Sequence, residues 1–100
     1  MPAQIDIPMD KVRDFCGRWK VTEFSLFGSV LRDDFRPDSD VDVLVTFAPN
    51  ATWNAFDLVE MREVLEALFA RRVDLVERSA VRNPIRRRAM LQGHEVIYAA

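Results

Sequence analysis

Two carboxylates, Asp40 and Asp42, stand at the beginning of the otherwise apolar stretch Val41–Phe47. Residues two apart on a strand point to the same side, about 6 to 7 Å from each other, so these two acids should repel one another on one face. Mg²⁺ would remove that conflict, because it prefers oxygen ligands and typically binds one or two carboxylates together with substrate phosphates. The pair therefore predicts a magnesium site. The simpler alternative is a surface turn in which Asp38 and Ser39 cap backbone groups.

A third carboxylate, Asp74, lies between two apolar residues in the stretch Val73–Glu77. If this stretch is a strand beside Val41–Phe47, Asp74 can join Asp40 and Asp42. Three acids can hold two metal ions roughly 3.5 to 4 Å apart, an arrangement that stabilises the attacking and leaving oxygens in phosphoryl or nucleotidyl transfer. The third acid could also accept the proton of an attacking hydroxyl.

Gly28 and Ser29 directly follow another apolar stretch, Val21–Phe27. Glycine allows the backbone to approach a ligand closely, and exposed amides with a serine hydroxyl are suited to phosphate oxygens. Taken alone, the pair is better explained as a turn glycine followed by a helix-capping serine. A nucleophilic serine is excluded, because no G-x-S-x-G sequence surrounds Ser29 and His94 is the single histidine available as a base.

Hydrophobic periodicity and breaker residues predict the elements that position these side chains. The predicted helices are Pro8–Trp19, Trp53–Ala70 and Arg82–Leu91, and the predicted strands are Val21–Phe27, Val41–Phe47, Val73–Glu77 and Glu95–Ala99. A right-handed crossover through the second helix would leave the second and third strands parallel and close together. The expected fold class is α+β, a small mixed sheet packed against helices.

Apolar residues at three-and-four spacing predict the buried face of the second helix. They are Phe56, Val59, Leu65, Leu68 and Phe69. Trp53 is also expected to pack in the core or at the helix end rather than to stack on a base.

The chain has 100 residues, of which 49% are hydrophobic, and we expect a single domain over residues 1–100. One cysteine, Cys16, excludes an internal disulfide, and the absence of a signal sequence or membrane-spanning run predicts a cytoplasmic location. The net charge is −2, but arginines cluster from Arg71 to Arg88. That cluster indicates an acidic or polyanionic partner or a solvated helix face; nucleic acid is the weaker reading, because aromatic residues do not interleave with it.

Two stretches together, "LFGSVLRDDFRPDSDVDVLVTF" and "RRVDLVERSAVRNPIRRRAM", resemble the minimal nucleotidyltransferases of the DNA polymerase beta type. The resemblance extends from about Val21 to Tyr98 and implies a nucleotidyltransferase fold. It implies nucleotide-binding roles for Gly28, Ser29 and Arg32, and catalytic and metal-binding roles for Asp40, Asp42 and Asp74.

The resemblance also implies a reaction and a partner. Such proteins use Mg²⁺ to transfer AMP from ATP, and many are antitoxins that modify a tyrosine of a HEPN-type ribonuclease toxin. This chain departs from the family pattern at Val30, Leu31 and Asp33, where a small or basic pair and a glycine are common. The departure keeps an alternative open, a catalytically weak or inactive antitoxin that neutralises its toxin by binding alone. A homo-oligomer is compatible with the sequence.

Overall fold

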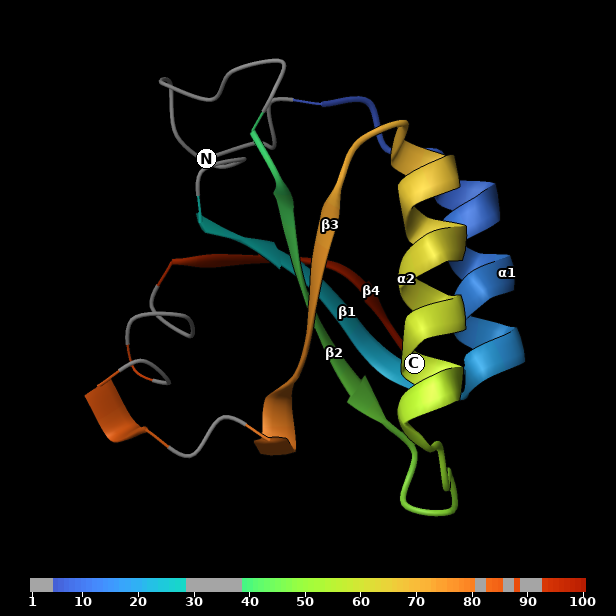
Figure 1. Ribbon diagram of the computed structural model, residues 1–100, viewed down its shortest axis with the longest axis vertical. Helices are drawn as coiled ribbons and strands as arrows, with labels where there is room; N and C mark the ends of the chain where they lie inside the picture. The colour runs from blue at the N-terminus through green and yellow to red at the C-terminus, as the bar shows by residue number, and fades with distance from the viewer. Residues whose placement is uncertain (1–4, 29–38, 81–82, 86–87, 89–92) are drawn as a thin grey trace.

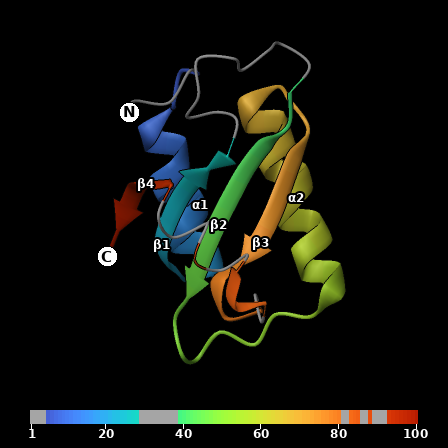
Figure 2. The ribbon, with the colours of Figure 1, turned by 90° about the vertical axis from the view of Figure 1, so that its left-hand side faces the viewer.

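The computed structural model describes residues 5–28, 39–80, 83–85, 88 and 93–100. Its sheet has four strands in the order β3-β2-β1-β4, and two helices lie side by side against one face (Figures 1 and 2). The elements in chain order are α1 (Met9–Trp19), β1 (Val21–Phe27), β2 (Val41–Phe47), α2 (Ala55–Phe69), β3 (Val73–Glu77), the 3₁₀ turn η2 (Arg78–Ala80) and β4 (His94–Ala99). The predicted fold class, a small mixed sheet packed against helices, is confirmed.

The sheet is mixed because β1 pairs antiparallel with both β2 and β4, whereas β2 pairs parallel with β3. The parallel pair is joined through α2, as the crossover rule predicts. The bounds of β1, β2 and β3 agree with the predicted strands, and β4 begins one residue earlier than predicted, at His94.

The alternation of side chains along β2 divides its residues between the two faces of the sheet. Val41, Val43 and Val45 are fully buried in the cluster that includes the apolar residues of both helices. Leu44 points to the opposite face, where it packs with the partly buried Phe27 and Val76. Because alternate residues share a face, Asp42 lies on the side of Leu44, away from α1 and α2.

A reciprocal capping box fixes the start of α2. The Asp57 amide donates to Asn54 Oδ1 at 2.9 Å, and the Asn54 amide donates to Asp57 Oδ2 at 3.0 Å. The helix therefore begins at Ala55, two residues after the predicted start. Trp53 lies outside the helix: its indole Nε1 donates to the Trp19 carbonyl at 2.8 Å, so its predicted packing role at the helix end is confirmed.

The predicted buried face of α2 is partly wrong. Met61, Leu65 and Phe69 are buried, but Phe56 is 85% exposed and Val59 is 44% exposed. Phe56 precedes Leu65 by nine residues, which at about 100° per residue places it about half a turn away from the buried side. The Met61–Leu65–Phe69 spacing of four determines which side faces the sheet.

Both helices end at a non-glycine residue in the left-handed conformation, Lys20 (φ 56°) after α1 and Ala70 (φ 55°) after α2. The Lys20 amide donates to the Cys16 carbonyl, and the Ala70 amide donates to the Glu66 carbonyl. Each helix thus turns into the next strand over a very short link.

The predicted helix Arg82–Leu91 lies largely outside the described residues. Of its members that are described, Pro84, Ile85 and Arg88 are helical. Within the described parts of the chain, no helix combines the length and the apolar character that crossing a bilayer would require.

Candidate active site

Asp42 and Asp74 are direct partners in the register of the parallel strands β2 and β3. Neighbouring strands lie about 4.8 Å apart, and residues opposite each other point to the same face. Val41 and Val73, the preceding partners, are both buried against the helices, so the two carboxylates project from the opposite face. The prediction that Asp74 lies beside Asp42 is consistent with this register, although the catalytic roles of the two acids remain a prediction.

Gly28 directly adjoins Asp42. It follows β1, whose last residue, Phe27, is the register partner of Asp42, and it has a φ of +75°. A Cβ atom at this position would collide with Asp42 Oδ2 and would lie 3.3 Å from its Cγ. Glycine is therefore required here both by the backbone conformation and by the space that the carboxylate occupies.

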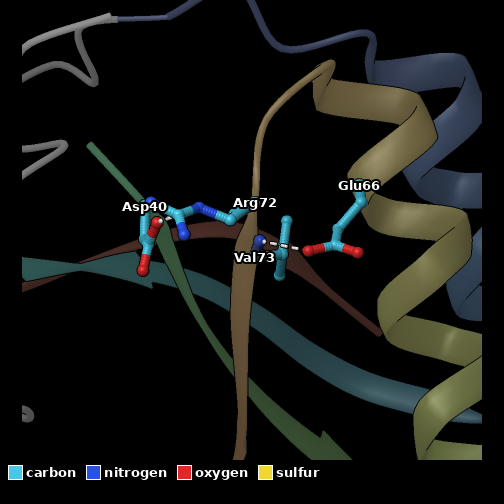
Figure 3. Close-up of polar contacts among 4 residues, drawn as sticks. All are labelled: Asp40, Glu66, Arg72 and Val73. Carbon is cyan, nitrogen blue, oxygen red and sulfur yellow. Dashed lines mark hydrogen bonds and ion pairs between the residues drawn. The ribbon is translucent and has the colours of Figure 1, made fainter. Parts of the chain in front are cut away.

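Asp40 forms an ion pair that the sequence analysis did not anticipate. Its Oδ1 lies 3.2 Å from Nε of Arg72, and the two side chains are 50% and 79% exposed (Figure 3). The backbone of the same arginine also joins the strands, because the Arg72 carbonyl accepts a 2.9 Å hydrogen bond from the Val41 amide. Arg72 could have been found from its position two residues before Asp74, which puts both on one side of an extended chain.

The beginning of β3 is tied to α2 by a side chain. Glu66 Oε2 accepts a 3.0 Å hydrogen bond from the Val73 amide, and Figure 3 shows Glu66 reaching from α2 toward β3 while Arg72 extends the other way, toward Asp40. The carboxylate satisfies a backbone donor at the first residue of the strand. It therefore fixes the backbone one residue before Asp74.

The carboxylates of Asp42 and Asp74 are suitable ligands for a divalent cation. Two carboxylates on adjacent strands offer hard oxygen ligands. Two such charges 5 Å apart repel by about 1 to 3 kcal/mol, if the effective dielectric constant lies between that of a protein surface and that of water, and a bound cation would relieve this repulsion. Among the described residues, however, no three acidic, histidine or cysteine side chains are gathered closely enough to hold a metal. Asp40 is directed to Arg72 instead, so the expected three-acid arrangement is not assembled.

Two predicted site residues lie outside the described residues, and two side chains without a predicted site role, His94 and Cys16, lie away from Asp42. Ser29 and Arg32, with the nucleotide-binding roles that the family resemblance implies, lie outside the described residues. His94 is the register partner of Phe27 at the start of β4, so it is two strands, roughly 10 Å, from Asp42. Cys16 is buried in the core, and its burial raises the pKa of the thiol from 9.0 to about 12, as suits an unreactive side chain.

Comparison with known proteins connects this arrangement to one family. The nucleotidyltransferase domain family matches residues 9–97. A Thermococcus cleftensis protein named protein adenylyltransferase MntA is 40% identical over 81 residues, which are 81% of this chain and 77% of that protein.

Solved structures share the fold. One described as a minimal nucleotidyltransferase has a TM-score of 0.70 and 32% identity, over 87% of this chain and 86% of its own. A chain from a complex of an AMPylated Shewanella oneidensis HEPN toxin with its MNT antitoxin has a TM-score of 0.67 and 18% identity, over 92% of this chain and 70% of its own. The resemblance drawn from the Gly-Ser and Asp-x-Asp stretches is thereby confirmed, and the chain belongs to the nucleotidyltransferase domain family.

Proposed function

We propose that the chain is a Mg²⁺-dependent protein adenylyltransferase that moves AMP from ATP to a tyrosine hydroxyl of a HEPN-type toxin and so acts as its antitoxin. The relative from Thermococcus cleftensis is named a protein adenylyltransferase. The Shewanella oneidensis complex pairs an antitoxin of the same fold with an AMPylated toxin. ATP and Mg²⁺ are both abundant in the cytoplasm, which is the location that the proposal implies.

The register of Asp42 and Asp74 is the observation that carries the proposal. These two carboxylates come from separate strands, project from the sheet face that α1 and α2 leave uncovered, and lie beside the close backbone approach at Gly28. Paired acids next to a glycine turn are what a metal–triphosphate complex requires, because the acids bind the cation and a turn without a side chain admits the phosphates.

In the proposed reaction, the acceptor oxygen forms a bond to the α-phosphorus of ATP while the bond to pyrophosphate breaks. Asp40, Asp42 and Asp74 would hold Mg²⁺, which when bound supplies positive charge against the triphosphate. Asp74, an exposed residue of β3 and the register partner of Asp42, would also accept the hydroxyl proton. Gly28, together with Ser29 and Arg32, would orient the phosphates.

The test is a modification assay with the HEPN-type toxin encoded nearest to this chain's own gene. Wild-type protein, toxin, ATP and Mg²⁺ should yield toxin heavier by one or more AMP groups in intact-mass spectrometry. Asp42→Asn and Asp74→Asn should each abolish the added mass. Asp14→Asn, a change of the same chemistry at an exposed position on α1, should leave it unchanged.

The same variants, expressed together with the toxin in cells, separate catalysis from inhibition by contact. If Asp42→Asn protects cells from the toxin as well as wild type does, and no AMP is found on the toxin in either case, the chain neutralises its partner by binding alone. Loss of protection together with loss of the added mass supports catalysis.

A further inference from the structure

We propose that Arg72 is an exchangeable counter-ion of the metal site: its guanidinium holds Asp40 in the absence of metal, and a divalent cation must displace it to bind that carboxylate. The inference rests on the proposed function, because it concerns the same acidic edge. It gives a cause for the absence of a three-acid cluster among the described residues, since Asp40 Oδ1 lies 3.2 Å from Arg72 Nε.

The strand register places four charged residues in two adjacent rows. Val41 is the partner of Val73 and Asp42 that of Asp74, so the preceding residues, Asp40 and Arg72, face each other at the strand entry. Alternation puts Arg72 on the same side as Asp74. A cation at the carboxylates of Asp42 and Asp74 would therefore lie beside this guanidinium, and the two positive charges would repel.

The backbone around Arg72 is fixed, while its side chain is not enclosed. Its carbonyl accepts from the Val41 amide, and the next amide, that of Val73, donates to Glu66. The guanidinium-bearing side chain is 79% exposed and extends away from α2 (Figure 3). Replacing this side chain consequently leaves both backbone anchors in place, and movement of the guanidinium requires no change in the strands.

An exposed ion pair of this kind is weak enough to exchange. Such pairs are worth about 0.2 to 1 kcal/mol, which converts at about 1.4 kcal/mol per tenfold to a factor of about 1.5 to 5 in a binding constant. Removing the arginine eliminates both the competition for Asp40 and the repulsion of the incoming cation. Both effects have the same sign, so the bare metal should bind more tightly.

The test measures binding of Mn²⁺ alone, without nucleotide or toxin, by isothermal titration calorimetry and by the loss of the free-ion electron paramagnetic resonance signal. Arg72→Gln should lower the Mn²⁺ dissociation constant about 1.5- to 5-fold, and Arg72→Lys, which keeps the charge, should stay near wild type. The matched control is Arg18→Gln. Arg18 pairs with Glu60 at 3.9 Å with both side chains similarly exposed, but on the helical side, so its loss should not change the constant.

The results distinguish failure of this inference from failure of the proposed function. If Arg72→Gln binds Mn²⁺ as wild type does, or more weakly, while Asp42→Asn loses binding, the metal site stands and the counter-ion role of Arg72 is refuted. If Asp42→Asn binds as tightly as wild type, or if neither wild type nor Arg72→Gln binds, the counter-ion role of Arg72 is refuted, and the mass added to the toxin decides the proposed function separately. Binding that becomes measurable only in Arg72→Gln supports the exchange.

Discussion

Replacing Gly28 by alanine should destabilise the protein for two reasons, the backbone conformation at this position and the space that Asp42 occupies. At a φ of +75°, alanine is disfavoured by about 1 to 2 kcal/mol. The added methyl group would also collide with Asp42 Oδ2, which obliges the carboxylate to turn away from the backbone. We expect the free energy of unfolding to fall by about 1 to 2 kcal/mol, which for a domain of this size lowers the melting temperature by about 4 to 8 °C per kcal/mol.

Gly17 provides a matched control within the same chain. It lies in α1, and a Cβ atom built there would have no atom within 4 Å. Gly17→Ala should therefore stabilise the protein, by about 0.5 to 1 kcal/mol, through helix propensity alone. Thermal unfolding followed by circular dichroism gives the two shifts, which should have opposite signs.

Titration with Mn²⁺ tests the second part of the reasoning. Gly28→Ala should weaken Mn²⁺ binding because it displaces Asp42, whereas Gly17→Ala should not change it. A Gly28→Ala protein that melts within about 1 °C of wild type and binds Mn²⁺ equally well would refute the close packing between Gly28 and Asp42.

Three further changes test the framework around the site. Glu66→Ala removes the acceptor of the Val73 amide and should cost about 1 to 3 kcal/mol in urea unfolding, whereas Glu63→Ala, an exposed change on the same helix, should stay within about 0.5 kcal/mol. Asn54→Ala removes half of the capping box and should cost about 1 kcal/mol, seen as a lower midpoint in the same titration; no change would mean that the box does not stabilise α2. Because burial raises the pKa of Cys16 to about 12, the stability that this thiol contributes should be complete below pH 9 and should fall as pH rises from 9 toward 12, by up to about 1.4 kcal/mol per unit. Urea unfolding across that range should show a shallower decline for Cys16→Ala than for wild type, and parallel declines would contradict the assignment.

Local patterns in the sequence were sufficient to place the strands. The runs Val21–Phe27, Val41–Phe47 and Val73–Glu77 are short, rich in β-branched and aromatic residues, and bounded by residues that break strands, so their ends were predicted as observed. The parallel pairing of the second and third followed from the handedness of the crossover. The buried side of α2 was harder to predict, because its apolar residues encircle the helix and the spacing alone did not exclude Phe56.

The candidate site depended on information that a linear pattern does not contain. That Asp42 and Asp74 are neighbours was inferable from two strands and one helix, but the ion pair between Asp40 and Arg72 depends on the register of those strands to a single residue. The contact of Gly28 with Asp42 likewise required the antiparallel alignment of β1 with β2. Predictions from sequence therefore identified which residues to examine, and the strand register determined which of them meet.

The hydrogen-bonded link between α2 and β3 restricts where proteins with this fold can gain or lose residues. After Ala70 the chain has two residues before β3, and the Arg71 amide, the Arg72 carbonyl and the Val73 amide are each hydrogen-bonded. One inserted residue here would transfer every following side chain of the strand to the other face and carry Asp74 into the apolar interior. The turn from residue 48 to residue 54 is anchored near its ends, where the Ala48 amide donates to the Lys20 carbonyl and the Trp53 indole donates to the Trp19 carbonyl, and lengthening it between these anchors costs little. Evolutionary insertions, and peptide tags introduced by an experimenter, should thus accumulate in that turn and be absent from the link.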